Sequence, residues 1–167
     1  MLKIETLSKM HNRADFDCDN DELNLYLQHI ARQHLNKGIS KTFVLIDDEQ
    51  PTSIIAYMTL IACEVQANKL PESWEKKYPK QIPAVKLARL AVAVKQQRKG
   101  YGELLIIEAM NKTIEVASNL GIAGLFVDAK NQRAKTYYQQ FGFISLPEKL
   151  ENLFLPLATI SKLLQKT

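Results

Sequence analysis

A long amphipathic helix that directly follows a glycine-containing loop is the feature that most constrains the fold of this chain. Residues 101–120 carry a polar stripe at helical spacing and are otherwise mostly apolar. The stripe consists of Glu108, Asn111, Lys112, Glu115 and Ser118. Residues 85–94, before the loop, are mostly apolar and predict a strand. A strand, a tight loop and a long helix in this order are typical of an α/β protein.

The rest of the chain extends this pattern. Residues 19–38 predict a helix that ends at Gly38, and Asp19 and Glu22 have the spacing of a capping box. Residues 41–46 and 53–65 predict a hairpin. Residues 66–83 hold three prolines and predict a surface excursion with a short helix near Trp74. The remaining elements are predicted at 125–129 (strand), 131–141 (helix), 143–146 (strand), 153–155 (strand) and 158–166 (helix). The order β-α-β-β-β-α-β-α-β predicts one α/β domain over residues 1–167 with a mixed sheet.

The composition excludes several classes of protein. A length of 167 residues with 46% apolar residues suits one globular domain. No apolar run approaches the roughly 18 residues of a membrane span, and the first residues lack the apolar core of a signal peptide. Cys18 and Cys63 stand alone, and no histidine has partners at metal-binding spacing. We therefore expect a cytoplasmic protein without a membrane segment or a metal.

Positive charge is concentrated in one part of the chain. Residues 65–100 hold nine Lys or Arg against Glu72 and Glu75, a net charge of +7 in a chain of +4. Such a segment indicates either an anionic partner, a phosphate-bearing cofactor or nucleic acid, or a solvated surface.

The loop at residues 95–102 has the residues of an anion site. Gly100 and Gly102 let backbone N–H groups approach an anion at a helix N-terminus, where the helix dipole favours negative charge. Lys95, Arg98 and Lys99 add positive potential. The spacing fits neither a Walker loop nor a dinucleotide fingerprint.

Two motifs together resemble the GNAT acetyltransferases. Gln97-x-x-Gly100-x-Gly102 is similar to the pyrophosphate-binding motif of that superfamily, and Tyr138-x-x-x-Gly142-Phe143 is similar to its usual C-terminal motif. The resemblance implies a mixed central sheet of about six to seven strands flanked by about four to five helices, with acetyl-CoA as cosubstrate. It implies cofactor contacts by Leu90, Ala91, Val92, Gln97, Arg98, Lys99, Gly100, Tyr101, Gly102, Asn131 and Tyr138.

A narrower resemblance covers nearly the whole chain. Residues 16–27, 41–45, 89–92, 127–129 and 153–160 are similar to bacterial GNAT toxins of the TacT and AtaT type. Asp19 and Ala88 stand where these toxins often have glycine, and Ala93 where they often have an acidic residue. The resemblance implies acetylation of the α-amino group of aminoacyl-tRNA, which blocks translation. It also implies a ribbon-helix-helix antitoxin, operator DNA bound only through the antitoxin complex, and a homodimer.

The residues also suggest a mechanism. Backbone N–H groups of residues 89–92 are candidates for binding the thioester carbonyl oxygen, and Tyr138 for protonating the leaving thiolate. The alternative role of Tyr138 is an aromatic packed beside Phe141 and Phe143. Residues 85–94 contain no carboxylate, which suits an amine that is already neutral, although Glu64 or Asp128 remain candidate bases.

Three functions stay open at this point. The first is acetylation of aminoacyl-tRNA, with Arg32, Lys37, Lys86 and Arg89 as candidate tRNA contacts. The second is acetylation of a small amine or a protein N-terminus. The third is a DNA-binding complex in which the chain serves as corepressor with an antitoxin.

Overall fold

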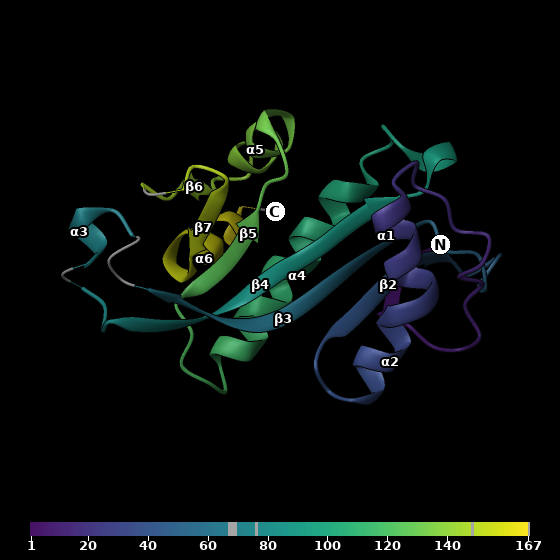
Figure 1. The fold of residues 1–167 in the computed structure, drawn as a ribbon, viewed down its shortest axis with the longest axis horizontal. Coiled ribbons are helices and arrows are strands. Elements are labelled where there is room, and N and C mark those ends of the chain that lie inside the picture. The colour runs from purple at the N-terminus through teal and green to yellow at the C-terminus, as the bar shows by residue number, and fades with distance from the viewer. Residues whose placement is uncertain (67–69, 76, 148, 167) are drawn as a thin grey trace. The chain divides into compact units, whose positions relative to one another are not determined.

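The computed structural model of the chain describes residues 1–66, 70–75, 77–147 and 149–166. Its strands form one seven-stranded sheet in the order β1-β2-β3-β4-β5-β7-β6 (Figure 1). The strands are β1 (Leu2–Thr6), β2 (Lys41–Asp47), β3 (Ala56–Gln66), β4 (Gln81–Val92), β5 (Gly124–Asp128), β6 (Ile144–Ser145) and β7 (Asn152–Pro156). The pair β4–β5 is parallel, whereas β1–β2, β2–β3, β5–β7 and β6–β7 are antiparallel. The predicted α/β fold with a mixed sheet is confirmed.

The chain divides into two compact units, and each consists of two separate segments of sequence. The first unit is Met1–Ile61 with Ala88–Ile107, and the second is Ala62–Leu87 with Glu108–Thr167. The boundaries fall within β3, β4 and helix α4 (Tyr101–Ala117). The single domain over residues 1–167 stays a prediction, and each unit is described here by itself.

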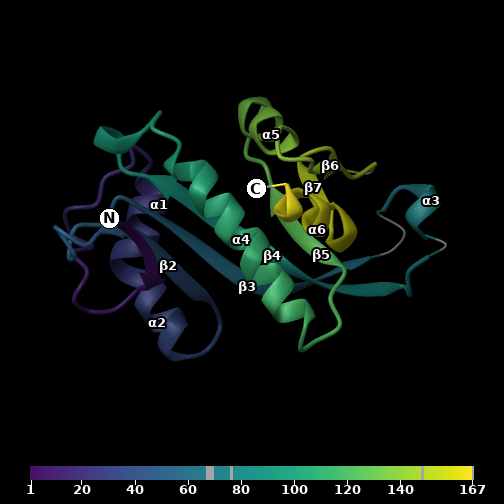
Figure 2. The ribbon, with the colours of Figure 1, turned by 180° about the vertical axis from the view of Figure 1, so that it is seen from behind.

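In the first unit, helices cover both faces of the sheet. Helices α1 (Asp21–Leu25) and α2 (Ala31–Asn36) lie over one face, and α4 begins along the opposite face (Figures 1 and 2). The π-helical turn η1 (Tyr26–Ile30) joins α1 to α2. A cluster of buried side chains fills the space beneath these helices. The cluster includes Leu7, Phe16, Cys18, Tyr26, Leu27, Ala31, Val44, Ile46, Ile54, Tyr57 and Ala91.

The N-cap of α1 differs from the prediction. The cap is Asn20, whose side-chain oxygen accepts a hydrogen bond from the Leu23 N–H at 3.0 Å. Asp19 instead has a φ of 62°, in the left-handed region that glycine adopts without strain. The capping box at Asp19 and Glu22 was therefore wrong, because the chain turns at Asp19 before the helix begins.

We expect Asn20→Ala to lower the free energy of unfolding by about 1 kcal/mol, the usual effect of removing an N-cap oxygen. Denaturant unfolding would measure it. The matched control is Asp19→Asn, because asparagine tolerates a positive φ and Asp19 does not cap the helix. A larger loss in the Asp19→Asn variant than in Asn20→Ala would contradict this assignment.

In the second unit, β5 lies between β4 and β7. Val85 pairs with Leu125 in the parallel register, and Leu125 pairs with Leu155 in the antiparallel one. Helix α6 (Leu157–Gln165) packs against β7 and β5. The core of this unit consists of Val65, Leu70, Ile82, Ala84, Phe126, Leu146 and Phe154.

The surface excursion is shorter than predicted. Strand β4 begins at Gln81 rather than at residue 85, and it contains Pro83. Ile82 and Ala84 are buried while Pro83 is exposed, and Pro83 has no N–H to donate to a neighbouring strand. The short helix near Trp74 is confirmed as α3 (Glu72–Glu75). The parts of the prediction that fall on residues 67–69 and 76 lie outside the described residues.

Most other predicted elements are confirmed within a few residues. Helix α4 ends at Ala117 rather than at residue 120, α5 spans Gln132–Gln139, and β6 is only two residues long. In the described part of the chain, no helix is long and apolar enough to cross a membrane. The same residues contain no group of three or more His, Cys, Asp or Glu side chains that would hold a metal ion.

Candidate active site

A short loop between β4 and α4 presents unpaired backbone donors. The loop follows the 3₁₀ turn η3 (Val94–Gln96), and it places Arg98 at a φ of 64° and Gly100 at 84°. A non-glycine residue in the left-handed region is uncommon and is concentrated at functional sites. Within the described residues, the N–H groups of residues 98–102 donate to no protein acceptor, while the Leu104 N–H already donates to the Gly100 carbonyl. Donors of this kind at the start of a 17-residue helix suit an anion.

The Gln97 side chain anchors this loop. Its amide donates to the Val92 carbonyl at 3.0 Å and to the Cys18 carbonyl at 3.4 Å. Both acceptors belong to the backbone, so the side chain ties the loop to the end of β4 and to the segment before α1. A direct contact from Gln97 to a cofactor stays a prediction.

The charges around the loop are positive. Lys95, Arg98 and Lys99 are exposed, and Lys99 donates to the Gln96 side-chain oxygen at 3.1 Å. Neither Lys95 nor Arg98 forms an ion pair with a described residue. These cations reinforce the dipole of α4 in favour of phosphate groups.

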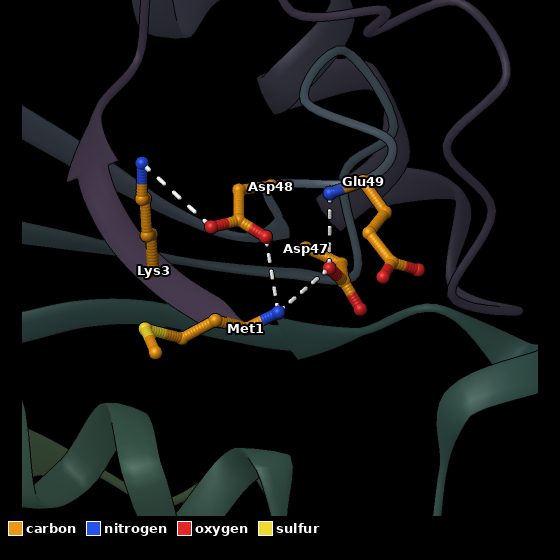
Figure 3. Close-up of polar contacts among 5 residues, drawn as sticks. All are labelled: Met1, Lys3, Asp47, Asp48 and Glu49. Carbon is orange, nitrogen blue, oxygen red and sulfur yellow. Dashed lines mark hydrogen bonds and ion pairs between the residues drawn. The ribbon is translucent and has the colours of Figure 1, made fainter.

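A pocket of about 220 Å³ elsewhere in the first unit has the opposite character. Its walls include Asp47, Glu49, Gln96 and Tyr101. The Met1 ammonium lies 3.2 Å from Asp47 and 3.0 Å from Asp48 (Figure 3). The hydrogen bond from the Glu49 N–H, followed by that from the ammonium, holds the pKa of Asp47 below its usual value. Carboxylates at this place repel phosphate, so the pocket is a poor site for a pyrophosphate, although Tyr101 is one of the predicted cofactor contacts.

The end of β4 provides the second predicted group of backbone donors. Ala91 is buried, and Leu90 and Val92 are half-buried. The next two N–H groups are occupied: Ala93 donates to the Ile55 carbonyl at 2.9 Å and Val94 to the Asp17 carbonyl at 2.8 Å. The binding of a carbonyl oxygen by the N–H groups of residues 89–92 stays a prediction.

Tyr138 lies on α5 among aromatic rings. Its ring centroid is 5.6 Å from that of Phe143 and 5.7 Å from that of Tyr137. Gly142 has a φ of 98° in the turn after α5, which explains the glycine of the Tyr-x-x-x-Gly-Phe motif. Burial raises the pKa of Tyr138 above its ordinary value. The Tyr138 hydroxyl forms no hydrogen bond with a described residue, and its role as proton donor stays a prediction.

Asn131 serves as the N-cap of α5. Its side-chain oxygen accepts from the Ala134 N–H at 2.9 Å. The residue is exposed, and its cofactor contact stays a prediction.

The predicted tRNA-contacting cations have different surroundings. Lys86 lies 2.8 Å from Asp128 and over the ring of Phe126, so it is paired and Asp128 is a weaker candidate base. The Arg89 guanidinium carbon lies 3.6 Å from the centre of the Tyr26 ring. Arg32 is half-buried, and Lys37 is exposed at the C-terminus of α2.

A second group of cations was missed by the sequence analysis. Lys130, Arg133 and Lys135 lie at the start of α5, the helix that carries Tyr138, and none forms an ion pair with a described residue. The sequence shows an excess of positive charge here, because residues 129–147 contain these three cations and no Asp or Glu. The predicted basic segment covered residues 65–100 only.

Comparison with known proteins identifies the class of this site. Residues 38–145 match the acetyltransferase (GNAT) domain, and the chain belongs to that family. A tRNA-acetylating toxin of Mycobacterium tuberculosis (strain ATCC 25618 / H37Rv) is 26% identical over 149 residues, which cover 89% of this chain and 88% of the relative.

Two solved structures extend the similarity. The complex of AtaT with acetyl-methionyl-tRNAfMet has a TM-score of 0.90 and is 36% identical, covering 98% of this chain and 99% of that chain. A mutant AtaT toxin bound to the C-terminus of the antitoxin AtaR and to acetyl-CoA has a TM-score of 0.82 and is 34% identical, covering 99% of both chains.

Proposed function

We propose that this acetyltransferase is a toxin that uses acetyl-CoA to acetylate the α-amino group of aminoacyl-tRNA and so blocks translation. The observation that carries the proposal is the cradle of free N–H groups at residues 98–102, in a chain similar along almost its whole length to a toxin solved with acetylated tRNA. Aminoacyl-tRNA as substrate implies action in the cytoplasm.

The residues of the loop fit acetyl-CoA. Its pyrophosphate needs several N–H donors and positive charge, which residues 98–102 and the side chains of Lys95 and Arg98 supply. When bound, acetyl-CoA provides an acetyl group activated as a thioester. The second predicted set, residues 90–92, would hold the acetyl end.

Tyr138 supplies the proton in this proposal. The amine nitrogen forms a bond to the acetyl carbon while the carbon–sulfur bond breaks, and the Tyr138 hydroxyl gives its proton to the leaving sulfur. The proton released by the acetylated nitrogen then restores the hydroxyl. The raised pKa keeps Tyr138 protonated around pH 8, where an α-amine becomes neutral.

The charges near β4 favour an α-amine over a lysine side chain. A peptide α-amine has a pKa of about 7.7–8.0, and the ester of an aminoacyl group lowers it further, whereas a lysine amine at about 10.4 benefits from a base. Residues 85–94 carry no carboxylate, and Asp128 is held by Lys86. A strand without a carboxylate suits an amine that is neutral before it binds, while Glu64 on β3 stays a candidate base.

The free cations of α5 suit an RNA substrate. Lys130, Arg133 and Lys135 lie within eight residues of Tyr138 in the sequence and have no carboxylate partner. We add them to Arg32, Lys37, Lys86 and Arg89 as proposed tRNA contacts.

Replacing Lys130, Arg133 and Lys135 together by glutamine should weaken tRNA binding and flatten its salt dependence. Each lost phosphate contact lowers the slope of log K against log salt by about 0.7–0.9. Fluorescence anisotropy at several salt concentrations would measure both effects. The matched control replaces Lys9, Lys41 and Lys162, which are exposed, as Lys130 and Arg133 are. An equal loss in both triple variants would show that only net charge matters.

The direct test of function is mass spectrometry of charged tRNA. A complete pool of charged tRNA is incubated with labelled acetyl-CoA and digested with RNase, and we expect acetylated aminoacyl-adenosine. Uncharged tRNA and a lysine-bearing peptide are the controls. Efficient acetylation of the peptide with none on any charged tRNA would leave the small-amine or protein N-terminus acetyltransferase as the better reading.

The proposed partners follow from the same similarity. We propose neutralisation by a ribbon-helix-helix antitoxin, operator DNA bound only through that complex, and a homodimer. Growth arrest on expression of the chain, relieved by Tyr138→Phe, distinguishes the enzyme from the corepressor. A corepressor would act on the operator equally well with either residue.

A further inference from the structure

We propose that Tyr26 is a positioning residue that holds the Arg89 guanidinium so that its N–H groups face an anionic or carbonyl oxygen of the acyl acceptor. The inference rests on the proposed function for the identity of that acceptor. It assigns to Tyr26 and to the π-helical turn a role that the motifs of the sequence do not indicate.

Arg89 lies next to the predicted acetyl-binding residues. It precedes Leu90, Ala91 and Val92 on β4. Because side chains alternate along a strand, Arg89 and Ala91 share one face of the sheet. Ala91 belongs to the same core cluster as Tyr26, so this face lies toward η1.

The Tyr26 ring is held firmly in place. Only 3% of the residue is exposed, and its hydroxyl lies 3.2 Å from the Ser40 hydroxyl. The edge of the ring packs against His34, with 5.9 Å between centroids. Tyr26 begins the π-helical turn, a rare form that is often found at functional sites.

The guanidinium lies against the face of the Tyr26 ring, and we infer a parallel stack, which leaves the guanidinium edge free. A separation of 3.6 Å between the guanidinium carbon and the ring centroid is a close cation–π contact. The five N–H donors of arginine lie in the guanidinium plane. Within the described residues they donate to no acceptor, and Arg89 has no carboxylate partner.

A neighbouring tyrosine does not neutralise Arg89. The Tyr57 hydroxyl donates to the Leu23 carbonyl at 2.7 Å, and burial raises the pKa of Tyr57 against the opposing effect of the Arg89 cation. Tyr57 therefore stays neutral and gives Arg89 no anionic partner. A half-buried arginine that is fixed by stacking but lacks an anion is suited to bind one that arrives with the substrate.

The test compares Tyr26→Leu with Tyr26→Phe in acetylation of charged tRNA. Leucine removes the aromatic face, so we expect KM for charged tRNA to rise about 3- to 30-fold, the range of a partly desolvated cation–π contact. Phenylalanine keeps the face and loses only the hydroxyl contact to Ser40, so it should rescue KM. Melting temperature reports structural loss separately, and binding of acetyl-CoA should change in neither variant.

A double-variant cycle decides whether Tyr26 acts through Arg89. Arg89→Gln alone should raise KM, and adding Tyr26→Leu to it should raise KM no further. The NMR signal of the Arg89 Nε–H should move away from its ring-shifted position in Tyr26→Leu but not in Tyr26→Phe.

Additive effects on KM, or an unchanged KM in Tyr26→Leu, would overturn the inference while leaving the proposed function intact. A wild-type protein that acetylates no charged tRNA would instead overturn the proposed function, and the acceptor assigned to Arg89 with it.

Discussion

Replacing Tyr138 by phenylalanine is expected to lower the turnover of acetyl transfer by about 10²–10⁴-fold, the usual contribution of general acid catalysis. The substitution keeps the ring that packs against Phe143 and Tyr137 and removes only the hydroxyl, which has no other described partner. Single-turnover acetylation of charged tRNA would measure the chemical step.

Two further measurements separate chemistry from binding and stability. Calorimetric affinity for acetyl-CoA should change little in Tyr138→Phe, and so should the melting temperature. Tyr137→Phe is the matched control, because that ring also packs within the aromatic group, against Phe141 at 5.2 Å between centroids. Turnover near that of the wild type under conditions where chemistry limits the rate would mean that water or another group protonates the sulfur.

Replacing Gly100 by valine is expected to weaken acetyl-CoA binding by about 10- to 100-fold, because each hydrogen bond to a charged group contributes about 1.5–3 kcal/mol. Gly100 has a φ of 84°, which a β-branched residue adopts only with strain, so the N–H groups of the loop would no longer converge. A steric clash within the protein is not the cause, since no atom lies within 4 Å of the position of an added Cβ. Isothermal titration calorimetry would measure the loss.

The same substitution at Gly121 is the control for Gly100→Val. Gly121 is exposed, has no positive φ and also has open space around its added Cβ. Gly102→Val is a second variant, in which the bulk at the second motif glycine obstructs the approach of the pyrophosphate. Wild-type affinity in folded Gly100→Val and Gly102→Val proteins would disprove the assignment of the cofactor site.

Features set by neighbouring residues could be predicted from the sequence. The long helix, the hairpin of β2 and β3 and the glycine loop each depend on short-range periodicity or on one or two glycines, and all appear in the structure. The N-cap was placed one residue too early because Asp19 and Asn20 are both good caps, and only the φ of Asp19 distinguishes them.

Features set by distant residues could not be predicted. The pairing of Lys86 with Asp128 depends on the parallel register of β4 and β5, which brings together residues about forty positions apart. The stack of Arg89 on Tyr26 depends in the same way on how η1 packs over the sheet. Neither contact can be predicted from neighbouring residues in the sequence, so the sequence alone does not distinguish Lys86 and Arg89 from cations without a partner.

The division of the chain into two interleaved units also orders events during synthesis. The anion-binding loop belongs to the unit that is complete once Ile107 has emerged, whereas Tyr138 belongs to the unit that needs the segment after Glu108. The order of synthesis therefore places the residues of the proposed cofactor cradle ahead of the proposed proton donor. In the proposed mechanism, acetyl transfer therefore waits until α5 has been synthesised.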